Sequence, residues 1–275
     1  MNRRLGTATA EGRPGRALRR EQKVVTVTHS SGSDLQRIGS YIAAEPGPGR
    51  FPLVAGGKAA PLVVASADHR GVLRVVNDLQ ADIERVTGVR PAVVHDRVPD
   101  ADEGVLIGTI GASPLIDRLI AEGRLDVTGI AGRWETSLEQ VIEDPLPGVR
   151  RAFVIAGSDQ RGTIFGAYDV SREIGVSPWY WWADVPVPHR DELYVLPGRH
   201  TQGTPKVKYR GFFINDENPA LGTWAPAYFG PGYAPGHPGG FTSRFYAKVY
   251  ELMLRLKANY LWPAVWGRAF AEDDP

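Results

Sequence analysis

One stretch decides the predicted fold: Val207-Lys208-Tyr209-Arg210-Gly211-Phe212-Phe213-Ile214-Asn215-Asp216-Glu217. Its apolar, aromatic part has the composition of a strand, whereas Asn and Asp are depleted inside strands. We therefore expect a strand that ends where the Asn-Asp-Glu triplet begins. A helical pattern over 242–257 and a second short apolar run at 260–262 follow it. Strand, helix and strand in this order predict a parallel α/β unit.

Polar side chains at the end of this strand form the first candidate site. In a (β/α)8 barrel the catalytic residues lie at the carboxyl ends of the strands. We therefore predict that Asn215, Asp216 and Glu217 line a pocket where such a barrel begins. Turn or capping chemistry for the following loop would explain the same residues equally well. The chain has 275 residues, so we expect the barrel that starts at 206–275 to be incomplete.

The helix predicted between the two strands has a single apolar stripe. Its members fall at helical spacing: Phe245, Tyr246, Val249, Leu252, Met253 and Leu256. Glu251 and Arg255, four residues apart, are expected on the other side of the helix. The stripe suits an outer helix that packs against strands, and binding of a partner helix is the alternative.

A long connection at 218–241 precedes this helix. Its prolines restrict the backbone and stand at 219, 226, 231, 235 and 238. Connections of this length without secondary structure are usually functional or disordered. Four aromatic residues indicate an ordered loop that faces a ligand: Trp224, Tyr228, Phe229 and Tyr233.

Residues 51–177 have the pattern of a small α/β domain. Apolar runs predict strands at 61–65, 91–94, 105–108, 136–142 and 151–156, the last two as an antiparallel hairpin. Helices are predicted at 71–87, 114–122 and 164–174, with Gly88 ending the first and Ser113-Pro114 opening the second. Residues 1–50 are irregular apart from a short helical pattern at 35–44. Residues 178–205 form a junction rich in Pro and Trp.

Composition narrows the function classes. A net charge of +1 gives no general attraction to nucleic acid or to an anionic membrane, so neither is expected as a partner. The chain has no cysteine and its six histidines have no pair at metal-ligand spacing, so we predict no metal and no cofactor. The basic first twenty residues lack the apolar segment of a secretory signal. The compartment stays open, with the cytoplasm favoured over secretion.

Two further motifs have simple structural interpretations. Gly157-x4-Gly162-Thr163 resembles a phosphate-binding loop but has threonine where that loop needs lysine, which favours a tight strand-to-helix turn. Trp179-Tyr180-Trp181-Trp182 places four aromatic residues in a row. Burial at a domain junction is favoured for them over stacking on sugar rings. Alternation along the run would place two rings in each domain.

Several segments, in the same order along 50–275, resemble glycoside hydrolase family 115: Gly157–Thr163, Gly175–Pro186, Arg210–Glu217, Leu254–Ala264 and Trp266–Phe270. The resemblance implies a small α/β domain like the one that precedes hexosaminidase barrels, followed by a (β/α)8 barrel. It implies removal of α-1,2-linked (4-O-methyl)glucuronic acid side chains from glucuronoxylan with inversion, without a cofactor. Activity would require later barrel strands, on which the family places basic groups for the uronate carboxylate and the expected general acid.

The resemblance places Asn215 and Asp216 in the glucuronate pocket, with Glu217 beside them. We take Asp216 and Glu217 as the candidate catalytic residues. Adjacent carboxylates on one strand point to opposite sides, so the two are not expected to form an acid–base pair together. The candidate substrate-binding residues are Asn215, Trp224, Trp262 and Trp266, with core packing as the alternative for the last two.

Two other functions stay open at this point. A chain with an incomplete barrel would serve as a non-catalytic carbohydrate-binding protein. The pattern of the first domain also fits an N-acetylhexosaminidase-like hydrolase. The expected partner of the family activity is glucuronoxylan or its oligosaccharides, and a homodimer of the full-length protein is left open.

Overall fold

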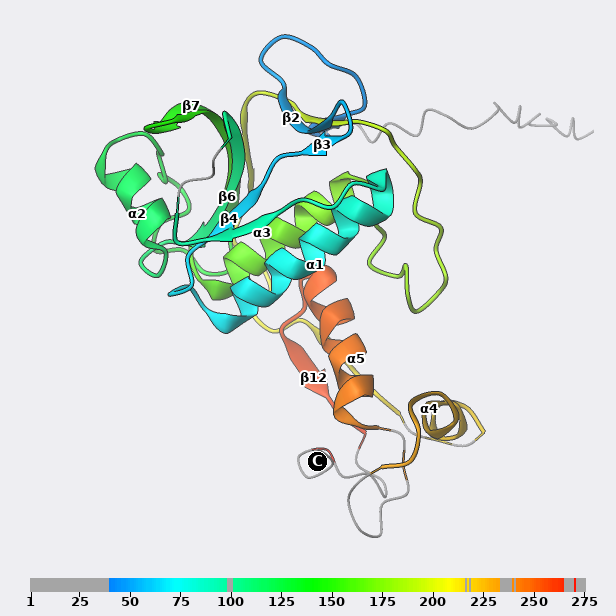
Figure 1. The fold of residues 1–275 in the computed structure, drawn as a ribbon. Helices are drawn as coiled ribbons and strands as arrows, with labels where there is room; N and C mark the ends of the chain where they lie inside the picture. Colours follow the sequence, from blue (N-terminus) through cyan, green and yellow to red (C-terminus); the bar gives the residue numbers. More distant parts are fainter. Residues whose placement is uncertain are drawn as a thin grey trace, which may run out of the picture. The chain divides into compact units, whose positions relative to one another are not determined.

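A six-stranded mixed sheet forms the larger part of the fold (Figure 1). The computed structural model describes residues 40–97, 101–215, 217, 219–232, 239, 241–264 and 270. The strand order is β10-β7-β8-β6-β4-β5; β5, β4, β6 and β8 run parallel, and β7 is antiparallel to β8 and β10. The bounds are β4 (Leu62–Val64), β5 (Val93–His95), β6 (Glu103–Thr109), β7 (Ser137–Leu146), β8 (Val149–Gly157) and β10 (Arg199–Gln202).

Helices cover both faces of this sheet. Alternate strand residues face two separate cores, one shared with α1 (Arg70–Thr87) and α3 (Gln160–Glu173) and the other with α2 (Pro114–Ala121). The predicted helix at 71–87 is confirmed, and Gly88, with φ of 74°, ends it in the left-handed conformation. The predicted hairpin is confirmed too, since β7 and β8 are antiparallel and joined through Pro147 and Gly148.

A second sheet, with the order β1-β9-β2-β3, shows what the sequence reasoning missed. Its strands are β1 (Ile42–Ala43), β2 (Phe51–Ala55), β3 (Lys58–Ala59) and β9 (Leu193–Val195). The prediction of a short helix over 35–44 is wrong at Ile42 and Ala43, because these residues pair with β9; residues before 40 lie outside the described part. The junction at 178–205 contributes β9 and β10, which return to the two sheets. The domain boundaries themselves stay predictions.

The last third contains the predicted strand–helix–strand unit. β11 (Gly211–Phe213) and β12 (Tyr260–Trp262) pair in parallel, and α5 (Ser243–Arg255) connects them. The stripe of α5 faces a third core built around Phe245 and Val249, as predicted, although Leu256 is 41% exposed. The parallel α/β unit that the opening stretch predicted is therefore confirmed.

The connection before α5 contains a helix that the sequence did not predict. It contains α4 (Leu221–Phe229), with Pro226 inside the helix, so the prediction of a loop throughout 218–241 is wrong at these residues. Leu221, Ala225 and Phe229 pack into the third core. Burial of these side chains offsets the backbone hydrogen bond that a proline removes from a helix. Residues 218, 233–238 and 240 lie outside the described part.

Candidate functional site

The predicted site lies at the carboxyl ends of β11 and β12. Just past the ladder, Ile214 N donates to Trp262 O at 2.9 Å. Ile214 is buried in the third core, whereas Asn215 and Glu217 are exposed. The chain thus turns from the core to solvent at the residue where the polar triplet begins. Asp216 lies outside the described residues.

Trp262 is brought to the same end of the sheet as Asn215. Its side chain is 57% exposed, and its ring makes an edge contact with Phe213 at 5.3 Å between centroids. The same end of the sheet thus carries an exposed indole and an exposed amide, an apolar face and hydrogen-bonding groups of the kinds that small-ligand sites combine. Trp266 lies outside the described residues.

Trp224 belongs to a different aromatic group. It lies on α4, is 39% exposed, and stacks on Tyr228 at 5.2 Å between centroids. Its ring also contacts Trp182 at 5.9 Å. A hydrogen bond of 3.2 Å from Gly222 N to Glu217 O joins α4 to the strand end. The helix therefore packs over Trp182, and a role for Trp224 in substrate binding stays a prediction.

The four aromatic residues at 179–182 are distributed unequally between two cores and the surface. Tyr180 packs against the core shared by α1 and α3, while Trp182 packs into the third core and donates its Nε1 to Lys248 O at 3.2 Å. Trp181 lies edge-on to Trp182, and Trp179 is 44% exposed. Packing at the junction is confirmed for three of the rings, but the expected two-and-two division is wrong.

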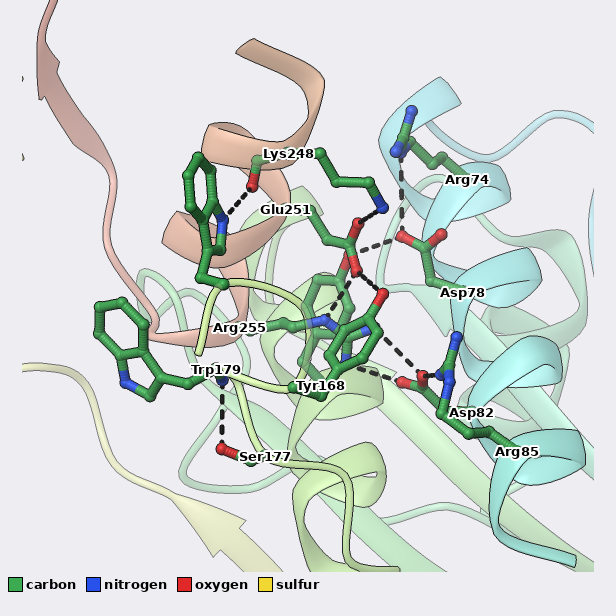
Figure 2. A network of polar contacts seen from close by, with 12 residues as sticks. Arg74, Asp78, Asp82, Arg85, Tyr168, Ser177, Trp179, Lys248, Glu251 and Arg255 are labelled. Atoms are coloured by element: carbon green, nitrogen blue, oxygen red, sulfur yellow. Dashed lines mark hydrogen bonds and ion pairs between the residues drawn. The ribbon is translucent and has the colours of Figure 1, made fainter. Parts of the chain in front are cut away.

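A buried cation holds α5 against α1 and α3 (Figure 2). Arg255 donates from both Nη atoms to Asp82 on α1, at 2.7 and 3.2 Å, and from Nε to Glu251 at 3.0 Å. Its guanidinium lies between the rings of Tyr168 and Tyr180, 4.6 and 4.9 Å from their centroids. We call these five residues the Arg255 network. Both Glu251 and Arg255 are buried in this contact, although charged pairs at this helical spacing usually lie on an exposed face.

The electrostatics of the Arg255 network follow from burial and pairing. Burial alone would lower the pKa of Arg255, but the charge of Asp82 and the hydrogen bonds to it raise the pKa. Burial opposes ionisation of Glu251, and the charges of Arg255 and Lys248 nevertheless lower its pKa. Burial and the charge of Glu251 raise the pKa of Tyr180 to about 12. The network therefore keeps Glu251 and the guanidinium of Arg255 charged and its two phenols neutral at neutral pH.

The glycine-rich loop at 157–163 serves close packing. A Cβ at Gly157 would collide with the backbone nitrogen of Thr163, and one at Gly162 with the carbonyl oxygen of Thr136. Asp159 caps α3 by accepting from Gly162 N at 2.7 Å. A side-chain cap and two close backbone approaches account for the motif, as the prediction of a tight strand-to-helix turn requires.

Two negative findings concern only the part of the chain that the structure describes. There, no three His, Cys, Asp or Glu side chains gather as metal ligands would. Within the described ranges, no helix combines the length and apolar composition that crossing a bilayer requires.

Comparison with known proteins shows which family the last third of the chain resembles. The model of glycosyl hydrolase family 115 matches residues 202–275, which hold β11, α5, β12 and the polar triplet. Over these residues the chain is similar to glycosyl hydrolase family 115. A solved family 115 4-O-methyl-α-glucuronidase, BtGH115A, described as specific for decorated arabinogalactans, is 32% identical with a TM-score of 0.64.

The family 115 similarity extends over most of this chain but over a limited part of the relative. The match to BtGH115A covers 78% of this chain and 26% of the solved one, so the chain spans about a quarter of that protein. The N-acetyl-β-hexosaminidase of Streptomyces plicatus and the one of Streptomyces coelicolor A3(2) also match, each at 14% identity with a TM-score of 0.43. These cover 80% of this chain, and 43% and 44% of the hexosaminidases. No curated protein sequence matches the chain.

Proposed function

We propose that the protein is a glycoside hydrolase that removes α-1,2-linked (4-O-methyl)glucuronic acid side chains from glucuronoxylan with inversion. The observation that carries this proposal is the family 115 match over the unit whose strand ends hold Asn215 and Trp262. The similarity to a 4-O-methyl-α-glucuronidase at 32% identity supports the proposal that the bond cleaved is the α-glycosidic bond of a 4-O-methylglucuronic acid. The β11–α5–β12 unit would be the beginning of a (β/α)8 barrel whose later strands complete the pocket.

The proposed chemistry needs two carboxyl groups on opposite sides of the sugar ring. In an inverting hydrolase an acid protonates the departing oxygen while a base activates water on the other face. Asp216 would anchor a sugar hydroxyl or position that water, Asn215 would hydrogen-bond the uronate, and Trp262 would offer a face to a pyranose ring. The general acid and the cations for the uronate carboxylate would come from later strands, so activity requires more of the barrel than this chain supplies.

The test compares this chain with a version extended through the complete barrel. We expect the extended protein, and not the 275-residue chain, to release methylglucuronic acid from glucuronoxylan. Asp216→Ala in the extended protein should lose activity by ~10²-fold or more, the effect of removing a positioned polar group. Glu122→Ala, an exposed change on the six-stranded-sheet domain, should leave activity unchanged.

A second candidate differs in the polymer that carries the uronic acid. BtGH115A is described as specific for decorated arabinogalactans, so a glucuronidated arabinogalactan belongs in the same assay. Faster release from that polymer would favour this candidate over glucuronoxylan. If the extended protein binds either polymer but releases no uronic acid, it is a carbohydrate-binding protein and the hydrolase proposal fails.

A further inference from the structure

The two strands of the candidate site are tied together at their amino ends. Arg210 immediately precedes β11 and Asn259 immediately precedes β12. The backbone nitrogens of Asn259 and Tyr260 donate to Arg210 O at 2.7 and 3.0 Å, and Arg210 N donates to Asn259 Oδ1 at 2.9 Å. Arg210 Nε also donates to Lys257 O at 2.8 Å. Backbone and side chain together therefore fix where the two strands begin relative to each other.

One carboxylate outside this unit holds both starting residues. Glu135, in the segment that leads into β7, has a side chain only 1% exposed. It accepts from Arg210 Nη2 at 2.6 Å and from Asn259 Nδ2 at 2.9 Å. Arg161 on α3 adds a third contact through its Nε, at 2.7 Å. A buried carboxylate is stable only when its oxygens are paired, and here two of the three partners are the residues that start the site strands.

Glu135 is itself held firmly in place. Its φ is 51°, in the left-handed region where residues other than glycine are strained. Its backbone nitrogen donates at 2.9 Å to Asp159 Oδ2, from the residue that caps α3. Strained residues of this kind persist where the surroundings over-determine them, and they cluster at functional positions. The carboxylate is thus a fixed point of the six-stranded-sheet domain rather than a mobile surface group.

The position of the amino ends determines the position of the carboxyl ends. Asn215 lies five positions after Arg210, which is about 16 Å of extended chain at ~3.3 Å per residue. Trp262 lies three positions after Asn259. The ladder between them runs without a register shift. A shift or rotation of Glu135 would therefore displace the carboxyl ends of β11 and β12, where Trp262 and Asn215 lie.

We propose that Glu135 is a positioning residue for the candidate site. It sets the relative placement of β11 and β12, and thereby the distance between Asn215 and Trp262 that a sugar ring would meet. The effect of this placement on catalysis rests on the proposed function. The coupling of Glu135 to the carboxyl ends of the strands is testable on this chain without any activity.

The test uses amide hydrogen exchange in the 275-residue chain. In Glu135→Gln the charged acceptor is lost at nearly constant shape, and we expect the Ile214 amide, which donates to Trp262 O, to exchange at least ~10-fold faster. The Val105 amide in the six-stranded sheet, which donates to Pro61 O, should keep its rate. Glu103→Gln is the matched control, because Glu103 also pairs with two arginines, Arg150 and Arg151, away from the site strands.

Two results would overturn the proposal. One is an unchanged Ile214 exchange rate in Glu135→Gln; the other is equal acceleration at Ile214 and Val105, which would mean general destabilisation. If Glu135→Gln does not fold, Arg161→Met removes one partner of the carboxylate without changing a residue of either strand, and it should accelerate Ile214 in the same way, by a smaller factor. An unchanged Ile214 rate in a folded Arg161→Met variant would also contradict the coupling.

The catalytic consequence is measured separately in the barrel-extended protein. Glu135→Gln is expected to lower kcat/KM on the cleaved polymer by at least ~10-fold, with most of the loss in kcat, because misplaced groups fail in the transition state. A loss confined to KM, or no loss, would remove Glu135 from the positioning of the reacting groups. If the unsubstituted extended protein cleaves no polymer, the proposed function fails, and the exchange experiment alone then decides the structural coupling.

Discussion

Replacing Arg255 by Met is expected to lower the free energy of unfolding by about 3 kcal/mol, at the low end of the ~3–5 kcal/mol range for removing one partner of a buried ion pair. The side chain of Asp82 is fully buried and would lose a bidentate partner. It would keep its ion pair with Arg85, and Glu251 would keep Lys248 and the Tyr180 hydroxyl. These remaining partners are the reason for the low end of the range.

Urea unfolding of the unsubstituted and substituted chains measures this effect. Arg118→Met is the matched control, because Arg118 and Glu122 form an ion pair at the same four-residue spacing but with side chains 50% and 37% exposed. Exposed pairs contribute ~1 kcal/mol or less, so the control should change stability little. Arg255→Lys should fall between the two, since lysine neither forms the bidentate pair nor stacks between two tyrosine rings. Equal losses in Arg255→Met and Arg118→Met would show that the network adds no stability.

The Arg255 network shows where helical periodicity stops being informative. The stripe of α5 was predictable because apolar residues recur at the helical period. The same spacing places Glu251 and Arg255 on the other side of the helix, but it does not indicate whether that side is buried. Their burial depends on Asp82, which is 173 positions from Arg255. No local pattern reports a partner at that distance.

The same limit explains the strands that the sequence did not reveal. β1, β3 and β9 are two or three residues long, and β1 pairs with β9 across some 150 positions. Runs so short have too few residues to show the alternation that identifies a strand. α4 was missed because its proline and the glycines around it suggested a loop, whereas its fold depends on packing against the third core.

The candidate site was predictable in part. The change from apolar to polar residues at Ile214 and Asn215 is local, and the structure shows the corresponding change from buried to exposed. No local pattern marks Glu135, because its two partners beside the site strands, Arg210 and Asn259, lie 75 and 124 positions away. Arg210 lies inside the stretch that carries the predicted strand, so the sequence does not mark it as the residue that precedes β11.

A second large effect is expected from pH acting on Glu139 in β7. The carboxyl group is almost fully buried, and its Oε1 has no hydrogen-bond partner among the described residues. Burial is the main cause that raises the pKa of Glu139 from 4.5 to about 8; the charge of Asp169 adds to it, while Ser137 and Lys257 oppose it. The folded protein therefore holds a proton on Glu139 at pH values where the unfolded chain has released it.

The direction of the effect follows from this difference in proton binding. Below pH 4.5 both states are protonated, and the group does not destabilise the fold. Between pH 4.5 and 8 unfolding releases a proton, so stability falls as pH rises, by up to ~1.4 kcal/mol per pH unit. From pH 5 to pH 8 the loss amounts to about 4 kcal/mol as an upper limit. His200 is opposite Glu139 on β10, and burial lowers its pKa. As pH falls below the ordinary pKa of histidine, the unfolded chain therefore binds a proton that the folded protein does not, and stability falls with decreasing pH, the reverse of the Glu139 trend.

Glu139→Gln isolates the carboxyl from His200, Asp169 and Lys257, because those groups stay in both proteins. Glutamine resembles the protonated acid in shape and does not titrate. The variant should therefore gain stability relative to the unsubstituted chain as pH rises, by at most about 4 kcal/mol between pH 5 and pH 8. Denaturant unfolding at pH 5, 6.5 and 8 measures the difference, and Glu143→Gln, an exposed change in the same strand, should show no such trend. A constant difference between Glu139→Gln and the unsubstituted chain at the three pH values would mean that Glu139 is ionised in the folded protein throughout, held by Lys257 rather than neutralised by burial.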